Sequence, residues 1–146
     1  YLYAIGGIGE YNVGLLRKCE RLSVSEDRWE ALQPLPQACC NASVVVVKET
    51  DCLYALGGTT AYSYLDVIQR LRLGRLEWDV MPLRLPSASS CIACFSKESK
   101  VWFVVGEKLY CLNALAECSI TLSKQVGEIK SECGPSYYYR GYLYCS

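Results

Sequence analysis

Two glycine pairs in matching surroundings constrain the fold of this 146-residue chain more than any other feature. Gly6-Gly7 and Gly57-Gly58 each close a short apolar run, and the two pairs lie 51 positions apart. Each pair is followed by a tryptophan, 22 residues later at Trp29 and 20 residues later at Trp78. Self-similarity at a period near 50 residues is typical of repeat architectures. We therefore expect several copies of one supersecondary unit.

The segments between these landmarks alternate as β-strands do. In residues 63–73, arginines at positions 70 and 72 alternate with leucines at 71 and 73, the pattern of a strand with one buried face. Gly74-Arg75 predicts a tight turn, and residues 76–80 return as the next strand. Residues 39–48 and 52–56 supply the two preceding strands, and no segment shows a sustained helical period. The unit is thus predicted to be a four-stranded antiparallel meander, in an all-β chain.

A third unit is weaker. Residues 90–95 and 100–105 match the first two strands, Val105-Gly106 stands in the place of the glycine pair, and residues 109–113 give the third strand. Residues 117–122 are expected to form the fourth strand, with no tryptophan before them. Residues 136–145 look like the opening hairpin of a further unit.

The order of glycine pair, charged strand, tryptophan and Leu-Pro or Met-Pro resembles the kelch repeat. Residues 29–36 and 78–83 match it best, whereas Leu22 and Leu71 stand where the family often has tyrosine. The third unit lacks both the glycine pair and the tryptophan. The resemblance implies a partial kelch β-propeller of about three four-stranded antiparallel blades, cut inside a blade at both ends.

On this resemblance the chain divides into a blade fragment with strands two to four (1–36), a complete kelch repeat (37–86), a degenerate repeat (87–130) and the opening hairpin of the next blade (131–146). Glycine permits a sharp turn and close backbone approach, and tryptophan is expected to pack between adjacent blades. Propellers close with about four to eight blades, so three are expected to sit in a longer chain or to pair with a second copy as a homo-oligomer. The structural repeat residues are Gly6, Gly7, Trp29, Gly57, Gly58 and Trp78.

The ten cysteines occur largely in or beside apolar strands, where free cysteine behaves as a small hydrophobe. A chain this rich in aliphatic residues needs no disulfide framework, so we expect reduced thiols and a cytoplasmic location. Cys91 and Cys94 have the spacing of a metal or redox pair, but residues three apart in a strand point to opposite faces, and a second ligand pair is missing. A redox role for Cys39-Cys40 stays open because it depends on exposure and thiol pKa.

Charge and composition disfavour several function classes. Fifteen basic residues balance fifteen acidic ones, which gives no electrostatic reason to expect nucleic acid or an anionic membrane as partner. The longest apolar run, residues 42–47, is too short to span a bilayer. The chain has no histidine, the usual copper ligand and acid–base catalyst. We therefore expect no enzyme activity, no catalytic residues, no metal and no cofactor, and an enzyme of the galactose-oxidase-like propeller type is the least favoured alternative.

The favoured function is a protein–protein interaction module that binds its partner through loops on one rim. The resemblance places these loops at residues 8–13, 37–41, 59–64 and 83–89. It also suggests the substrate-recognition propeller of a BTB-kelch adaptor for a cullin-type ubiquitin ligase, with the cullin bound only by a domain outside this chain. An actin- or cytoskeleton-associated structural kelch protein is the alternative. The expected contact residues are Glu10, Tyr11, Asn12, Thr60, Tyr62, Tyr64 and Arg84.

Overall fold

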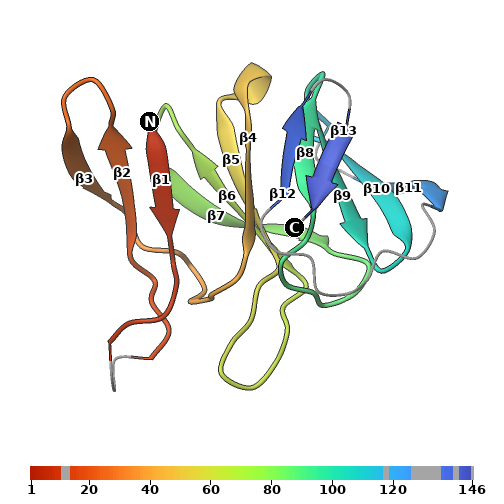
Figure 1. Ribbon diagram of the computed structural model, residues 1–146, viewed down its shortest axis with the longest axis horizontal. Helices are drawn as coiled ribbons and strands as arrows, with labels where there is room; N and C mark the ends of the chain where they lie inside the picture. Colours follow the sequence, from red (N-terminus) through yellow and green to blue (C-terminus); the bar gives the residue numbers. More distant parts are fainter. Residues whose placement is uncertain (11–13, 117–118, 126–135, 140–141, 146) are drawn as a thin grey trace.

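The computed structural model describes residues 1–10, 14–116, 119–125, 136–139 and 142–145, and these form antiparallel β-sheets (Figure 1). The expected all-β fold is confirmed: the described residues contain no α-helix, only a 3-10 turn, η1 (Lys48–Thr50). None of these residues belongs to a helix that could cross a membrane.

Each sheet follows the order of its strands in the chain, as a meander does. The first sheet has three strands, the second and third have four each, and a two-stranded hairpin follows. The strands are β1 (Leu2–Ile5), β2 (Cys19–Ser23), β3 (Arg28–Leu32); β4 (Ser43–Val47), β5 (Cys52–Leu56), β6 (Val67–Arg72), β7 (Glu77–Arg84); β8 (Cys94–Lys97), β9 (Lys100–Val105), β10 (Lys108–Asn113), β11 (Ile120–Gln125); β12 (Ser136–Tyr139) and β13 (Tyr142–Cys145).

Several strand boundaries differ from those expected from the sequence. β4 begins at Ser43 and not at residue 39, β6 begins at Val67 and not at residue 63, and β11 covers Ile120–Gln125 and not 117–122. β8 begins at Cys94 and not at residue 90, because Cys91 adopts a left-handed backbone (φ 51°) that interrupts an extended strand. β7 continues through Pro82 to Arg84 instead of ending at residue 80. The register between β6 and β7 shifts there, and a proline at such a bulge removes no ladder hydrogen bond.

The internal repeat is visible in backbone contacts. Gly6 and Gly57 have left-handed backbones, with φ of 63° and 60°. A Cβ on Gly57 would lie 2.2 Å from the Ser89 carbonyl oxygen, and one on Gly6 would lie 2.5 Å from the Cys39 carbonyl oxygen. At both positions the backbone conformation and the close approach require glycine.

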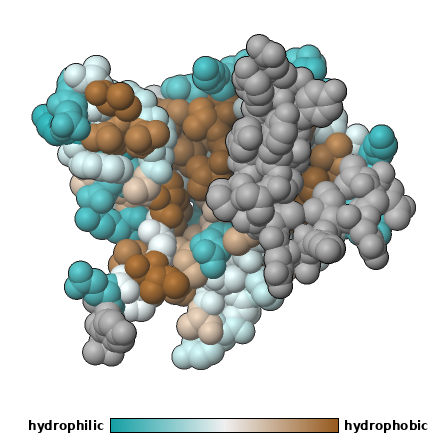
Figure 2. Space-filling view, in the orientation of Figure 1, coloured by the Kyte–Doolittle hydropathy of each residue, from teal (hydrophilic) through white to brown (hydrophobic). Residues whose placement is uncertain are grey.

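Two apolar clusters hold the sheets together. The cluster between the first and second sheets contains Cys19, Leu35 and Val67, and the Trp78 ring packs against it. The cluster between the second and third sheets is larger and includes Tyr54 and Phe103, both fully buried. Figure 2 shows apolar side chains gathered in the centre of the molecule, beside the first sheet. The second sheet is therefore buried on both faces.

The outer face of the first sheet has no such cover among the described residues. Leu2, Leu22 and Trp29 lie in one row across β1, β2 and β3. Their counterparts in the second sheet are Leu53, Leu71 and Trp78, which form the same row across β5, β6 and β7. Leu53 and Leu71 are fully buried, whereas Leu2 is exposed and Trp29 is 52% exposed.

Candidate functional site

Loop 57–66, between β5 and β6, is joined to the segment between β7 and β8. The Gly58 N–H donates to the Ser89 carbonyl oxygen (2.9 Å), and the Ser89 N–H donates to the Leu65 carbonyl oxygen (3.0 Å). Thr59 and Cys40 exchange two further backbone bonds, of 2.8 and 3.1 Å, with the segment that leads into β4. Figure 1 shows loop 57–66 extending from the side of the molecule opposite η1, as the loop after β1 does. Three segments thus share one rim.

The tip of loop 57–66 is a hydrogen-bonded turn. The Thr60 hydroxyl oxygen accepts the backbone N–H of Tyr62 (3.2 Å) and of Ser63 (3.0 Å), and the Thr60 N–H donates to the Ser63 carbonyl oxygen (2.8 Å). This turn presents Tyr62 at 98% exposure and Tyr64 at 62%. Two exposed aromatic side chains therefore stand on a backbone that is fixed before any partner arrives.

The remaining expected contact residues are more dispersed. Arg84 is exposed but ends β7, where it pairs with Val67 at the base of the same loop. Glu10 is exposed on the loop that follows β1. Tyr11 and Asn12 lie outside the described residues. The structure therefore brings Thr60, Tyr62, Tyr64 and Arg84 to one loop and its base.

A buried glutamine that the sequence pattern did not single out positions the neighbouring rim segment. Gln69 is fully buried in β6, accepts the Gln37 backbone N–H (2.8 Å) and donates to the Gln37 carbonyl oxygen (3.1 Å). It thereby substitutes for a strand partner and fixes residues 37–41, an expected rim loop, on the second sheet. The sequence feature that could have revealed this role is Gln69 itself, a polar residue on the buried face of β6.

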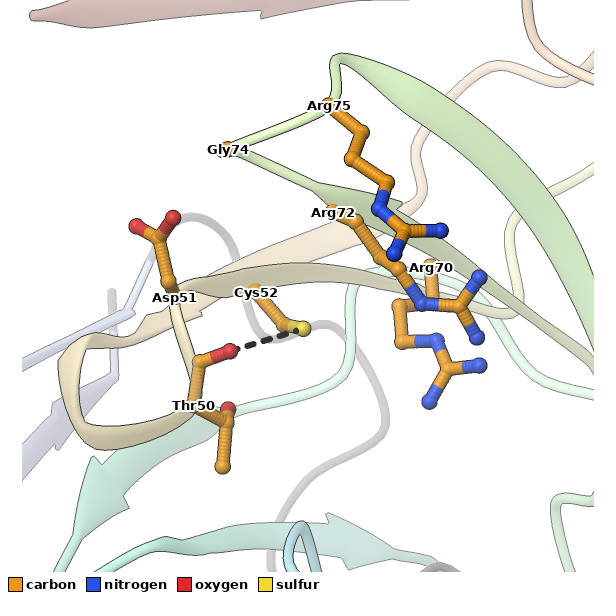
Figure 3. A pocket seen from close by; sticks show the side chains of 7 residues that line it. All are labelled: Thr50, Asp51, Cys52, Arg70, Arg72, Gly74 and Arg75. Atoms are coloured by element: carbon orange, nitrogen blue, oxygen red, sulfur yellow. Dashed lines mark hydrogen bonds between the residues drawn. The ribbon is translucent and has the colours of Figure 1, made fainter.

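A pocket of about 380 Å³ lies at the other end of the second sheet, near η1 and the turn between β6 and β7. Figure 3 shows the three arginine side chains on one side of it and Asp51 on the other. In the sequence, Arg70 and Arg72 stand out only as alternating polar positions, and nothing there predicts this pocket. The residues that line the pocket, hereafter the arginine pocket, are Thr50, Asp51, Cys52, Arg70, Arg72, Gly74 and Arg75.

A carboxylate outside the lining holds two of these arginines. Asp79 accepts two bonds from Arg70, Nε to Oδ1 at 3.0 Å and Nη2 to Oδ2 at 2.6 Å, and one from Arg72 Nη2 at 3.2 Å. The hydrogen bonds from Arg70, ahead of the nearby positive charges, hold the pKa of Asp79 below its ordinary value. The Arg70 side chain is 7% exposed and that of Arg72 is 43% exposed. Arg72 therefore has a fixed guanidinium that solvent still reaches.

Several cysteines have free thiols, and burial lowers the reactivity of two buried sites; the free thiols are those of Cys19, Cys39, Cys40, Cys52, Cys91 and Cys111. Burial, followed by the charges of Cys40 and Cys19, raises the pKa of Cys39 to about 11, and burial raises that of Cys94 to about 12. Because the thiolate is the reactive form, neither thiol suits redox sensing at neutral pH. No group of three or more potential metal ligands occurs among the residues that the structure describes.

Comparison with known proteins adds no relative. Neither the protein-family models nor the curated proteins contain a match to this chain. The function of the chain is therefore inferred from its own residues and contacts.

Proposed function

We propose that this chain is part of a kelch-type β-propeller and that it binds a protein partner through the rim that contains loop 57–66. The observation that carries the proposal is the pair of exposed tyrosines, Tyr62 and Tyr64, on a turn closed by Thr60. Tyrosine is enriched among the residues that dominate binding energy. A turn that is already ordered also loses little conformational entropy when a partner binds.

The propeller part of the proposal is supported by the repeat and by the bare face of the first sheet. The row Leu53–Leu71–Trp78 is covered by the neighbouring sheet, whereas the equivalent row Leu2–Leu22–Trp29 has no cover among the described residues. An apolar sheet face needs a packed partner. A further sheet of the same repeat, from the same polypeptide or from a second copy, would cover this row as the first sheet covers its equivalent. Sedimentation of the 146-residue chain tests the second-copy arrangement, and a stable monomer would contradict it.

The proposed biological role is substrate recognition in a cytoplasmic cullin-type ubiquitin ligase, with the cullin held by a domain outside this chain. The test is affinity purification of the protein from cells, with quantitative mass spectrometry of the proteins that accompany it. Recovery of a cullin and its RING partner supports this role. Recovery of actin and cytoskeletal proteins without a cullin would contradict it and support a structural role instead.

The rim itself is tested in the same experiment with the double variant Tyr62→Ala/Tyr64→Ala. If these tyrosines are hot spots, the variant should lose the partner by about tenfold or more, because a single hot spot contributes ~2 kcal/mol or more. Tyr1→Ala is the matched control, since Tyr1 is as exposed as Tyr64 but lies on the bare edge of the first sheet. Partner recovery that is equal for the double variant and the control would exclude this rim as the binding surface.

A further inference from the structure

The arginine pocket has more positive charge than its own carboxylates neutralise. The pocket lining contains three arginines, Arg70, Arg72 and Arg75, and one carboxylate, Asp51, while Asp79 lies outside the lining. Asp79 already binds Arg70 and Arg72. The Arg75 N–H donates to the Arg72 carbonyl oxygen (3.2 Å), but its side chain, which lines the pocket, makes no hydrogen bond or ion pair with a described residue. The Arg75 guanidinium is thus left without an ion-pair partner among the described residues, at the edge of an open pocket.

The repeat shows which of these arginines the fold itself uses. The hairpin β2–β3 matches the hairpin β6–β7 residue by residue, with four-residue turns that both end in a left-handed residue, Asp27 and Leu76. Arg70 and Asp79 have the counterparts Arg21 and Glu30, which are paired in the same way at 2.8 Å. This cross-strand ion pair therefore recurs with the repeat.

The other two arginines do not recur. The position of Arg72 is occupied in the first sheet by Ser23, which is buried, and the position of Arg75 by Glu26, which pairs with Arg28. The same turn is therefore built without either arginine. Arg72 and Arg75 are additions to the second sheet that its hairpin does not need for folding.

We propose that the arginine pocket binds a phosphate monoester, with Arg72 and Arg75 as the direct contacts and Asp79 as a positioning residue for Arg72. A guanidinium donates in a planar fork that suits the oxygens of phosphate. A phosphate group has about −1.5 to −2 charge and three acceptor oxygens, so it can engage two guanidiniums that come from different chain positions. The cavity of about 380 Å³ exceeds a phosphate group and leaves room for the group esterified to it.

This site is separate from the proposed protein-binding rim. The pocket lies at the η1 end of the second sheet, and loop 57–66 leaves the opposite end (Figure 1). Glycine at position 74 keeps the pocket open beside Asp51, since a Cβ there would lie 3.1 Å from the Asp51 Oδ2 atom. A phosphate bound here and a protein bound at the rim can therefore occupy the molecule together, and either proposal can fail without the other.

The test is titration of the ¹⁵N-labelled chain with phenyl phosphate at constant ionic strength, followed by NMR. We expect saturable shifts of the Gly74 and Arg75 amide signals and no comparable shifts at Ser25 and Glu26, the equivalent positions of the first sheet. Arg72→Gln and Arg75→Gln should each weaken the affinity by about tenfold, the loss of one charge-assisted contact. Arg28→Gln is the control, because it removes one exposed arginine from the first sheet without touching the pocket.

Three results would overturn the proposal. The first is the absence of saturable shifts in a chain whose spectrum shows that it is folded. The second is an equal loss of affinity in Arg28→Gln, which would mean that only net charge matters. The third is equal binding of benzoate, a planar carboxylate of similar size, which would remove the assignment to phosphate. Shifts of the same amides with inorganic phosphate, but at higher concentration, would support a site for an esterified phosphate over free phosphate.

Discussion

The first and second sheets are built on the same residues and differ in their surroundings. Both have an αL glycine in contact with a distant carbonyl oxygen, an arginine–carboxylate pair across the last two strands, and a Leu–Leu–Trp row on one face. The second sheet is covered on both faces and the first on one. Features shared by the two sheets belong to the fold, whereas features present in one sheet only need another explanation. Arg72 and Arg75 are of the second kind.

The third sheet shows how much of the pattern can be lost. The second and third sheets can be aligned at their first hairpins. Cys52 begins β5 opposite the last residue of β4, and Lys100 begins β9 opposite the last residue of β8. Tyr54 therefore corresponds to Trp102. The row Tyr54–Arg70–Asp79 is therefore replaced in the third sheet by Trp102–Cys111–Thr121. The four-stranded meander persists without the ion pair and without the glycine pair. Strand pairing and apolar burial are thus sufficient for the sheet.

The largest expected effect comes from adding one methyl group where the repeat brings two backbones together. Gly57→Ala should destabilise the chain by about 4 kcal/mol, because a left-handed alanine is strained and its Cβ would lie 2.2 Å from the Ser89 carbonyl oxygen. Urea unfolding followed by circular dichroism measures the loss, and failure to fold cooperatively would agree with it. Gly6→Ala should be nearly as harmful, since its Cβ meets the Cys39 carbonyl oxygen at 2.5 Å.

Gly106→Ala measures the cost of a left-handed alanine without the steric contact that a Cβ would make at Gly57. Gly106 has φ of 59°, close to that of Gly57, but a Cβ there has no neighbour within 4 Å among the described residues. The loss should be about 1 kcal/mol, the strain alone. Equal losses for Gly57→Ala and Gly106→Ala would contradict the close approach on which the comparison of the repeats depends.

The second prediction uses the tryptophans, which have equivalent positions and unequal cover. Trp78→Ala should destabilise the chain by about 3 kcal/mol, because Trp78 packs against the cluster that joins the first two sheets. Trp29→Ala should cost about 1 kcal/mol in the isolated chain, because half of that side chain is already in water. If a second copy covers Trp29, its substitution should also lower the association constant, and sedimentation would show this. Equal losses of unfolding free energy would mean that Trp29 is buried in solution.

The sequence predicted the all-β fold and much of the strand pattern because both follow from local signals. The period-two alternation and the turn residues placed β5 and β9 at the residues where the structure has them. The boundary of β7 was missed because a proline normally ends pairing, and only the register shift opposite Val67 makes Pro82 acceptable within the strand. The propeller itself remains a prediction, since the described sheets do not form a closed ring.

One of the two candidate sites could be predicted from the sequence and the other could not. The exposed tyrosines could be predicted because they lie on a loop fixed by the glycine pair. The arginine pocket could not, because it depends on the register that places Asp79 opposite Arg70 and on a turn that directs Arg75 back over β6. A period-two pattern states which residues share a face, but it does not state which strands become neighbours. The register between β6 and β7 therefore could not be predicted from the sequence alone.

The third prediction compares the two ion pairs. Arg70→Met should destabilise the chain by about 2 kcal/mol, because Asp79 loses its main partner and the Arg70 side chain is only 7% exposed. Arg21→Met should cause a smaller loss, because the Arg21 side chain is more exposed than that of Arg70 (20% against 7%) and exposed ion pairs contribute little. Urea unfolding at neutral pH measures both. A larger loss for Arg21→Met would reverse the ranking of the two pairs by burial.

The last prediction concerns pH and has the smallest effect. The pKa of Asp79 is lowered in the folded chain, first by the hydrogen bonds from Arg70 and then by the charges of Arg70 and Arg72. A carboxyl whose folded pKa lies below its unfolded value of about 3.9 stabilises the fold above that value, and this stabilisation is lost as the pH falls through the folded pKa. The difference in unfolding free energy between the wild type and Asp79→Asn should therefore be constant near neutral pH and shrink in acid. Glu30→Gln should show the same sign with a smaller change, because Arg21 lowers the pKa of Glu30 through one hydrogen bond, whereas Arg70 donates two to Asp79. A difference for Asp79→Asn that stays constant to about pH 2 would mean that Arg70 does not hold this carboxylate in solution.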